Sequence, residues 1–339
     1  MTRVAVIGAG SWGTSASWLL GGKGHDVSLW SREPEIAEAI NASHHNPAYM
    51  SDVVLPDNVV ASHDIGRVLE GVEAVVVVVP SLGVRTTAES MKPFLPGDLP
   101  IVILSKGVEM DTLMLMTEVL EDVLGSRERL AGLSGPNHAE EVGKGVPSAT
   151  VVAAYEARVG RLFQDLFMTR FFRVYTNPDV VGVELCGASK NVIAVAAGMS
   201  DGLGYGDNTK ATLMTRGLAE MGRLGSAMGA NPLTYMGLAG VGDLIATCTS
   251  KNSRNRALGE FIGRGGTLDG WRAQTNMVAE GAFACISVEE LGKREVVELP
   301  ITRQVRAVLY EGLSLASGED ALLGRAARDE LHGLGLIED

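Results

Sequence analysis

The chain has 339 residues, of which 46% are hydrophobic and 21% are charged, and its formal net charge at neutral pH is −12. This length allows two domains with cores of their own, and the composition excludes a disordered or fibrous chain. The negative charge argues against a protein that binds nucleic acid or an acidic membrane by general electrostatic attraction. An anionic ligand would have to be held by a local group of lysines and arginines.

The cysteines predict a reducing environment. Cys186, Cys248 and Cys285 are far apart and form no C-x-x-C pair, which is typical of reduced thiols. The first apolar stretch, residues 4–7, is too short for a signal peptide, and we expect no run of membrane-spanning length. We therefore expect a cytoplasmic protein without stable membrane insertion.

The N-terminus predicts a turn that binds a dinucleotide. A short strand over residues 3–7 leads into Gly8-Ala9-Gly10-Ser11-Trp12-Gly13, followed by a helix over residues 14–20 and a second strand over residues 27–30. Strand, G-x-G-x-x-G, helix and strand in this order form the dinucleotide-binding fingerprint. Its glycines allow a tight turn and a close approach of the pyrophosphate to the helix N-terminus.

The residues after the second strand bear on the choice of cofactor. An acid at this place binds the ribose 2′-hydroxyl of NAD, whereas an arginine accommodates the 2′-phosphate of NADP. Here Ser31 and Arg32 come first and Glu33 follows. The pattern favours NADP, or tolerance of both cofactors. The alternative is that Arg32 is a solvated loop residue.

Further strands are expected over residues 74–79, 101–104, 131–133, 149–152 and 171–175, with a helix over residues 112–124. This alternation predicts an α/β fold of the Rossmann type with a parallel, doubly wound sheet, in which ligands bind beyond the carboxyl ends of the strands. Lys106 follows one strand end, and residues 134–141 follow another. We expect Lys106 to serve the site, whereas His138 is more typical of a local hydrogen-bonding residue.

Asn177 and Pro178 mark the change to helical patterns, since either Asn177 or Asp179 can cap a helix whose first turn includes the proline. Helices are expected over residues 179–198, 208–228, 253–262, 277–291 and 300–310. The chain is thus predicted to consist of a dinucleotide-binding domain, residues 1–177, and an all-α substrate-binding domain, residues 178–339. The cleft between them is the expected active site.

Lys190 lies in a segment that reads as a helix apolar on every side, which should be buried. Burial lowers the pKa of a lysine toward neutrality and makes it a usable proton donor and acceptor. Asp243 follows Gly240-Val241-Gly242. It either caps a helix or orients the ammonium group of Lys190, and the sequence leaves both open.

A second basic cluster follows at Ser253-Arg254-Asn255. Ser253 fits an N-cap, so Arg254 and Asn255 would lie in the first helical turn. Free backbone N–H groups, the positive end of the helix dipole and a guanidinium group together make a phosphate site. An ordinary solvated helix start would look similar.

Taken in order, these segments resemble the bacterial-type NAD(P)-dependent glycerol-3-phosphate dehydrogenases. The resemblance extends from the first strand to about residue 300 and is carried by residues 8–13, 104–107, 135–140, 187–194, 208–221, 240–255 and 278–281. It implies interconversion of dihydroxyacetone phosphate and sn-glycerol 3-phosphate with NADP or NAD. It also implies a cytoplasmic homodimer that supplies glycerol 3-phosphate for glycerophospholipid biosynthesis.

The resemblance also implies roles for residues of this chain. Lys190 would be the proton acceptor, with Lys106 and Asp243 in catalytic roles and no metal. The implied substrate contacts are Lys106, Gly135, Asn137, Lys190, Asp243, Ser253, Arg254 and Asn255. The implied cofactor contacts are Gly8, Gly10, Ser11, Trp12, Gly13, Arg32, Lys106, Ala139, Arg254, Val278 and Glu280. The family usually has Ser or Thr where Asn137 stands and often Phe where His138 stands, which leaves the contact of the Asn137 side chain open.

Two alternatives stay open. A two-domain dehydrogenase acting on a hydroxy acid or a sugar acid would share this build, but it has no use for the Ser253-Arg254-Asn255 cluster beside the lysine. A non-catalytic nucleotide-sensing regulator would keep the glycine fingerprint, but it has no need for a buried Lys190. Turnover of NADPH with dihydroxyacetone phosphate separates both from the dehydrogenase that the resemblance implies.

Overall fold

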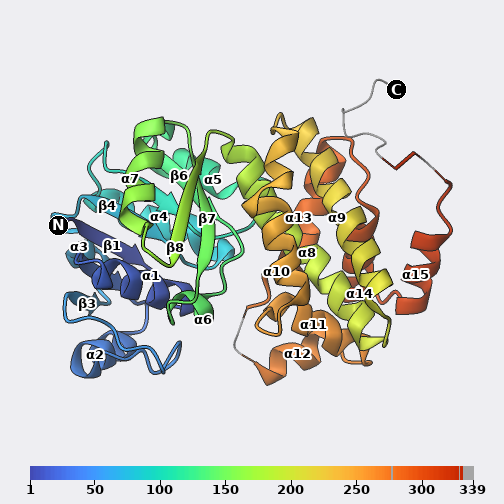
Figure 1. Ribbon diagram of the computed structural model, residues 1–339, viewed down its shortest axis with the longest axis horizontal. Helices are drawn as coiled ribbons and strands as arrows, with labels where there is room; N and C mark the ends of the chain where they lie inside the picture. Colours follow the sequence, from blue (N-terminus) through green and yellow to red (C-terminus); the bar gives the residue numbers. More distant parts are fainter. Residues whose placement is uncertain (276–277, 328, 331–339) are drawn as a thin grey trace. The chain divides into compact units, whose positions relative to one another are not determined.

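The computed structural model describes residues 1–275, 278–327 and 329–330 (Figure 1). The chain divides into two compact units, of which the first holds residues 1–105 and 116–180 and the second holds residues 106–115 and the chain from residue 181 onward. The short segment 106–115 thus belongs to the second unit, although the helical part of the chain starts much later. The domain boundary expected between residues 177 and 178 stays a prediction.

The first unit is built on one sheet with the strand order β3-β2-β1-β4-β5-β6-β7-β8. The strands are β1 Arg3–Ile7, β2 Asp26–Trp30, β3 Val59–Ser62, β4 Ala74–Val77, β5 Ile101–Ile103, β6 Leu130–Ser134, β7 Ser148–Ala154 and β8 Phe172–Asn177. The expected Rossmann-type sheet is confirmed, with one correction. β7 pairs antiparallel with β6 while β8 is parallel to β7, so the last two strands run against the other six. β3 was not predicted, because it is short and only two of its residues are buried.

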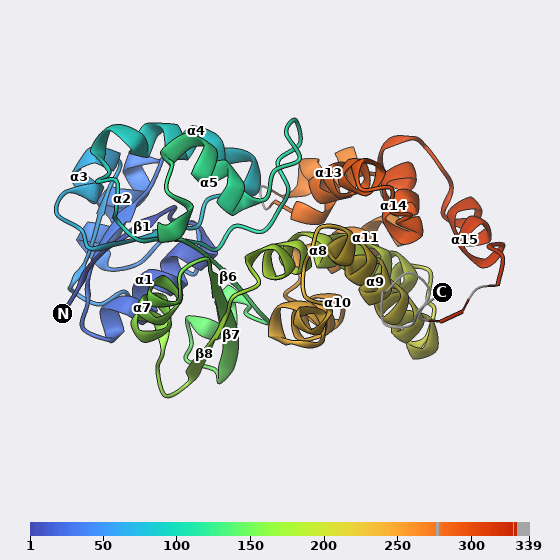
Figure 2. The same ribbon diagram turned by 90° about the horizontal axis from the view of Figure 1, so that it is seen from above.

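Helices cover both faces of this sheet. They are α1 Ser11–Gly22, α2 Pro34–Ser43, α3 Ile65–Leu69, α4 Val84–Met91, α5 Met116–Leu124, α6 Ala139–Val142 and α7 Ala157–Phe167. α1 and α7 pack together on one face, and α3, α4 and α5 pack on the other (Figure 2). The residues of β1 beyond Arg3 and all of β4 are therefore buried, as is typical of central strands that are covered on both faces.

The helix expected over residues 112–124 begins later, at Met116. Leu113 has a φ of 58°, the left-handed region that a right-handed helix cannot include. Val108 and Leu115 form an isolated antiparallel bridge instead. The segment between them is therefore a turn of the second unit.

The second unit is helical. Its helices are α8 Val180–Gly202, α9 Asp207–Ala227, α10 Asp243–Thr249, α11 Arg254–Gly263, α12 Leu268–Gln274, α13 Glu280–Arg294, α14 Pro300–Tyr310 and α15 Leu315–Leu323. α8, α9, α11 and α14 match expected helices, whereas α10, α12 and α15 were not predicted. Residue 277, the expected start of α13, lies outside the described residues. α8 begins at Val180, so Pro178 precedes the helix, and the expected place of the proline in its first turn is wrong. The Asn177 side chain accepts a hydrogen bond from the backbone N–H of Asp179 at 2.9 Å.

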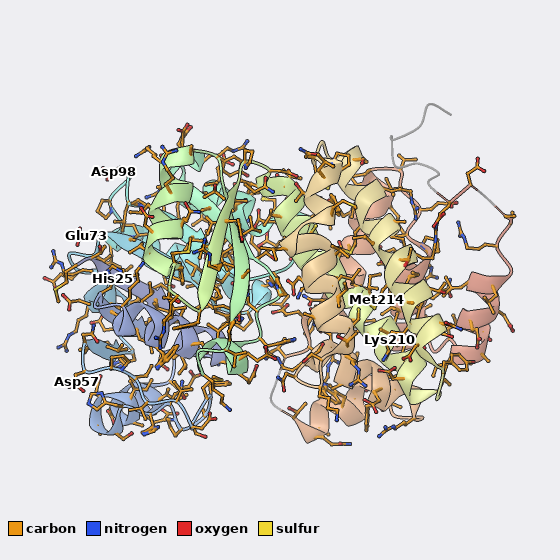
Figure 3. All side chains as sticks on the ribbon, viewed as in Figure 1. His25, Asp57, Glu73, Asp98, Lys210 and Met214 are labelled. Carbon is orange, nitrogen blue, oxygen red and sulfur yellow. The ribbon has the colours of Figure 1, made fainter. Side chains whose placement is uncertain are left out.

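α8 corrects the expectation that no run reaches membrane-spanning length. The helix is long and apolar enough to cross a membrane, but 94% of its most apolar window is buried inside the protein. Such burial is typical of the core helix of a soluble protein. An ion-pair cluster lies at its C-terminal end, where Asp201 pairs with Arg256 of α11 and with Lys210 of α9, which is labelled in Figure 3.

α8 and α11 are in backbone contact. A Cβ atom on Gly259 of α11 would lie 2.0 Å from the carbonyl oxygen of Val195, and one on Gly198 of α8 would lie 2.0 Å from the carbonyl oxygen of Arg256. Gly202 and Gly263 repeat the pattern one turn later. Only glycine permits this approach, which brings the start of α11 next to the middle of α8.

Gly259→Ala should destabilise the second unit, because the added methyl group has no room between the two backbones. We expect a loss of about 1–3 kcal/mol in the free energy of unfolding. Gly318→Ala in α15 is the matched control, since a Cβ there meets only contacts of 3.7–3.8 Å and alanine favours a helix. Thermal and urea denaturation measure both variants. A Gly259→Ala protein as stable as the wild type would contradict the backbone contact.

Candidate active site

The dinucleotide turn of the first unit has the geometry that its glycines require. Gly8 has a φ of +120°, and a Cβ on Gly13 would lie 1.7 Å from the carbonyl oxygen of Gly8. Neither position accepts a side chain. Around Gly10, in contrast, a Cβ would meet no atom within 4 Å. The turn is thus closed on the protein side and open where a ligand can approach.

The N-terminus of α1 follows directly. Gly10 occupies the N-cap position, and no side chain in the described part of the chain caps the helix. The first N–H groups of a helix have no acceptors within it, and they lie at the positive end of its dipole. An uncapped helix start beside an open glycine fits the pyrophosphate of a dinucleotide.

Residues 137–139 lie against this helix start. The indole N–H of Trp12 donates to the carbonyl oxygen of Asn137 at 3.0 Å, and the Ser15 hydroxyl donates to that of Ala139 at 2.8 Å. The structure therefore brings Ala139, an expected cofactor residue, next to the expected cofactor turn. Trp12 uses its polar atom for this contact, so its ring face is what remains for a ligand.

Arg32 is exposed, as the alternative interpretation held, but it is not isolated. The side chain is 82% exposed and forms an ion pair with Glu33 at 2.7 Å. Ser31 is buried, and its hydroxyl donates to the carbonyl oxygen of Glu33 at 3.0 Å. An exposed ion pair of this kind is weak, so a 2′-phosphate can compete with Glu33 for the guanidinium group.

Gly135 and Asn137 form a tight corner beyond the end of β6. A Cβ on Gly135 would lie 2.9 Å from the Cα of Thr150. The Asn137 side chain donates to the carbonyl oxygen of Ala149 at 2.9 Å, and its buried Oδ1 has no hydrogen-bond partner among the described residues. One amide N–H is thus engaged, and the second N–H and the acceptor oxygen are left.

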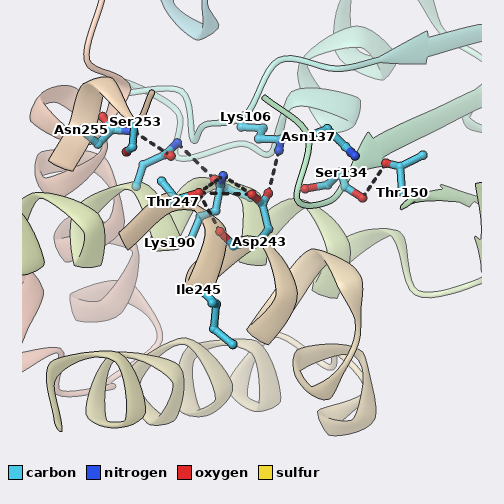
Figure 4. Close-up of polar contacts among 12 residues, drawn as sticks. Lys106, Ser134, Asn137, Thr150, Lys190, Asp243, Ile245, Thr247, Ser253 and Asn255 are labelled. Carbon is cyan, nitrogen blue, oxygen red and sulfur yellow. Dashed lines mark hydrogen bonds and ion pairs between the residues drawn. The ribbon is translucent and has the colours of Figure 1, made fainter. Parts of the chain in front are cut away.

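The second unit concentrates three charged side chains and one hydroxyl group (Figure 4). Asp243 accepts from the Nζ of Lys190 at 2.6 Å through Oδ1 and from the Nζ of Lys106 at 2.7 Å through Oδ2. Lys190 also donates to the Thr247 hydroxyl at 2.7 Å, and that hydroxyl donates to the backbone oxygen of Asp243 at 2.6 Å. Segments far apart in sequence thus meet at one carboxylate.

The environment shifts the protonation equilibria of this cluster. Burial lowers the pKa of Lys190 to about 8, with Lys106 acting in the same direction and Asp243 opposing it. Burial alone would raise the pKa of Asp243, but Lys106 and Lys190 outweigh it and hold that pKa below its ordinary value. A lysine with a pKa near neutrality beside a permanent carboxylate can both give and take a proton. The expected burial of Lys190 is confirmed, since the residue is 5% exposed.

Asp243 does not cap its helix. Gly242 occupies the N-cap position of α10, and Asp243 is the first residue of the helix itself. Both of its carboxylate oxygens point to lysines. The capping alternative is therefore wrong, and the orienting one describes the contact.

The start of α11 has the expected form. Ser253 is its N-cap and accepts from the backbone N–H of Arg256 at 3.2 Å. Arg254 is exposed, and among the described residues no carboxylate pairs with its guanidinium group. Asn255 is buried and uses its side chain inside the protein, donating to Oδ1 of Asn191 at 2.9 Å and accepting from the N–H of Gly281 at 2.8 Å. Contact of Asn255 with a ligand is thus left to its backbone and its remaining N–H.

The remaining expected residues lie at the start of α13. Glu280 is the first residue of this helix, and Val278 is half-buried just before it. Gly281, next to Glu280, is the residue that donates to Asn255. The side-chain amide of Asn255 therefore joins the starts of α11 and α13 to α8.

The sequence predicts no separate role for Thr247 or Asn191. Thr247 could have been found, because it follows Asp243 by four residues and such residues share one face of a helix. Asn191 directly follows Lys190, and its side chain receives the hydrogen bond from Asn255. No local pattern signals that contact, since the two asparagines lie far apart in sequence.

Both parts of the chain match one protein family. Residues 3–159 match the model of the NAD-dependent glycerol-3-phosphate dehydrogenase N-terminus, and residues 179–318 match that of the C-terminus. A glycerol-3-phosphate dehydrogenase (NAD(P)+) of Pelotomaculum thermopropionicum is 47% identical, covering 98% of this chain and 96% of the relative. One of Nocardia farcinica is 47% identical, covering 97% of this chain and all of the relative. The crystal structure of a glycerol-3-phosphate dehydrogenase from Coxiella burnetii superposes with a TM-score of 0.92 at 37% identity, covering 96% of this chain and 99% of that one.

Arg32→Ala should weaken the binding of NADPH more than that of NADH, because only NADPH carries the 2′-phosphate. A charge-assisted hydrogen bond contributes about 1.5–3 kcal/mol, so we expect a roughly 10- to 100-fold rise in the Kd for NADPH. Fluorescence titration with each cofactor measures the effect. Glu33→Gln is the matched control, since it frees the guanidinium group and should tighten NADPH binding slightly. An equal loss for both cofactors would remove Arg32 from the 2′-phosphate site.

Proposed function

The chain belongs to the NAD-dependent glycerol-3-phosphate dehydrogenase family, and we propose that it interconverts dihydroxyacetone phosphate and sn-glycerol 3-phosphate with NAD(P). The observation that carries this proposal is the buried ammonium group of Lys190, held between Asp243 and Thr247. The bound nicotinamide supplies or accepts the hydride at C2 of the substrate. The chain itself binds and orients the substrate and transfers the proton.

Lys190 is the proposed proton donor and acceptor. Its ammonium group has three N–H donors, and among the described residues two of them go to Asp243 and Thr247. The third is left for the oxygen on C2 of the substrate. In the reductive direction it stabilises the developing alkoxide and gives it a proton, and in the oxidative direction the neutral amine removes the proton from the hydroxyl group.

Asp243 and Lys106 complete the catalytic group in this proposal. Asp243 fixes the direction of the Lys190 ammonium group, since Oδ1 and the Thr247 hydroxyl define two of its three bonds. Lys106 adds a second cation 2.7 Å from the same carboxylate. This cation keeps Asp243 ionised and provides positive charge where an anionic substrate is bound.

The start of α11 is the proposed phosphate site. Arg254 is exposed in its first turn and, within the described part of the chain, has no ion pair of its own. The helix dipole and the first backbone N–H groups favour an anion at the same place. Holding the phosphate here fixes the carbonyl relative to Lys190, since Asn255 ties this helix start to Asn191.

The wider role follows from the reaction. We propose that the protein supplies glycerol 3-phosphate for glycerophospholipid biosynthesis, and that it works in the cytoplasm as a homodimer. The buried α8 and the three buried free cysteines support an intracellular enzyme. Analytical ultracentrifugation tests the dimer, and an unchanged monomer at high concentration would contradict it.

A single-turnover assay tests the central proposal. Purified protein is mixed with NADPH and dihydroxyacetone phosphate, and the loss of NADPH absorbance is followed. We expect turnover with this substrate and none with a panel of 2-keto acids and sugar acids. Turnover only with an acid would favour a hydroxy-acid dehydrogenase, and binding of NADPH without turnover would favour a nucleotide-sensing regulator.

The pH dependence should reflect Lys190. Its pKa is lowered to about 8, so the ammonium form dominates below pH 8 and the amine form above it. For reduction, which needs the proton, kcat/KM should fall as the pH rises through about 8. For oxidation, which needs the free amine, kcat/KM should rise over the same range and then level off. Steady-state kinetics between pH 7 and 10 in both directions measure the two profiles.

Lys190→Met is the control for that profile, because it keeps the apolar stem and the length without the charge. We expect turnover to fall by roughly 10²–10⁴ and the step near pH 8 to disappear. NADPH binding should persist, since the dinucleotide turn belongs to the other unit. A folded Lys190→Met protein with a near wild-type rate would show that the lysine is structural.

Arg254→Ala tests the phosphate site. We expect kcat/KM for dihydroxyacetone phosphate to drop roughly 10- to 100-fold, whereas unphosphorylated dihydroxyacetone, a poor substrate from the start, should lose much less. Arg256→Ala is the matched control, since this neighbouring guanidinium group already pairs with Asp201 and Glu260. Arg256→Ala should change kcat/KM for the phosphorylated and the unphosphorylated substrate by the same factor. Equal losses for both substrates in Arg254→Ala would contradict phosphate recognition by this residue.

A further inference from the structure

Asn46 is buried completely and uses all of its hydrogen-bonding capacity. Its Nδ2 donates to the carbonyl oxygen of Ala9 at 2.8 Å and to the hydroxyl oxygen of Thr14 at 2.9 Å. Its Oδ1 accepts from the backbone N–H groups of Ala48 and Tyr49, both at 3.1 Å. An asparagine side chain has two donors and two acceptor lone pairs, so none is left over.

These contacts reach the centre of the dinucleotide turn. Ala9 stands between Gly8 and Gly10, and Thr14 lies in the first turns of α1. Because the peptide group is planar and trans, the N–H of Gly10 points away from the carbonyl oxygen of Ala9. A side chain that fixes this carbonyl therefore fixes the direction of the Gly10 N–H, next to the open space around Gly10.

The segment that carries Asn46 is held by other contacts as well. The backbone N–H of Leu55 donates to the carbonyl oxygen of His44 at 2.8 Å. The backbone N–H of Val53 donates to the carbonyl oxygen of Met50 at 2.9 Å. Asp52 pairs with Lys144 at 2.7 Å. Residues 44–55 should therefore keep their fold without Asn46, and what is lost is the tie to the turn.

We infer that Asn46 is a positioning residue for the cofactor, one that orients the Ala9–Gly10 peptide and the first turn of α1 toward the pyrophosphate. This inference rests on the proposed use of NAD(P). His44 and Met50, at the two sides of Asn46, both adopt the left-handed region with φ of 56° and 58°. Non-glycine residues rarely adopt this conformation. The two residues flank the asparagine that forms hydrogen bonds with Ala9 and Thr14 of the turn.

Affinity for NADPH, measured by fluorescence titration, tests the inference without turnover. Asn46→Ala should raise the Kd for NADPH by roughly tenfold or more, the loss expected for one or two buried hydrogen bonds. Thr14→Val keeps the shape of that side chain, removes one acceptor and should raise the Kd by a smaller factor. The double variant should bind no worse than Asn46→Ala, because Thr14 acts through Asn46. kcat at saturating NADPH should stay within about threefold, which separates positioning from a general loss of structure.

Asn41→Ala is the matched control. Its side chain also bridges backbone groups, donating to the carbonyl oxygen of Ala61 and accepting from its N–H, both at 2.8 Å, but it does not touch the turn. It should lower the melting temperature and leave the Kd for NADPH unchanged.

Adenosine 2′-monophosphate, which lacks the pyrophosphate, is the second probe, read by competition with NADPH. Its affinity should be the same for Asn46→Ala and the wild type. Unchanged NADPH affinity in folded Asn46→Ala and Thr14→Val proteins, or an equal loss for adenosine 2′-monophosphate, would overturn the inference. Wild-type protein that binds NADPH but does not reduce dihydroxyacetone phosphate would overturn the proposed function instead, and the affinity comparison would still stand.

Discussion

The carboxylate of Asp243 lies between two ammonium groups, and the proposed catalytic group of the second unit depends on this contact. Lys106 and Lys190 bind to different oxygens of the same carboxylate. Without it, two neighbouring cations would repel each other, and the buried one would lose its proton well below the ordinary pKa of lysine. With it, both charges are held at fixed positions, and the pKa of Lys190 stays at about 8. A buried ion pair adds little stability for its own sake, whereas breaking one by removing a partner is costly. The arrangement is thus better explained by the proton chemistry that it allows.

In both units, the helix start that is proposed to bind a ligand is held by glycines and one buried amide side chain. Glycines let two backbones touch, and one buried amide side chain then fixes the register between them. In the first unit Gly13 lies against the backbone of Gly8, and Asn46 bonds to Ala9 and Thr14 in the same turn. In the second unit Gly198 and Gly259 bring α8 and α11 together, and Asn255 bonds to Asn191, the neighbour of Lys190. Such satisfied buried amides position backbone N–H groups and charged side chains without exposing polar atoms to a dry interior.

This arrangement links the two chemical tasks of the second unit. The helix start proposed to bind the phosphate and the helix that carries the proposed proton donor are packed together, so in this proposal the phosphate and the carbonyl of the substrate are held at a constant separation. Precise placement of this kind can account for a large part of the rate enhancement of an enzyme.

Most of the elements, and the chemistry at their ends, can be predicted from short stretches of sequence. Apolar periodicity and glycine spacing are local, so the dinucleotide turn, the central strands and the burial of Lys190 could all be predicted from short windows. Which side chains meet depends on the folded chain. It made Asp243 the partner of two lysines rather than a helix cap, and it engaged the amide of Asn137 with the backbone of β7. It also placed residues 106–115 in the second unit and reversed the last two strands of the sheet. These outcomes rest on contacts between residues far apart in the chain, and no local pattern encodes the partner of a side chain.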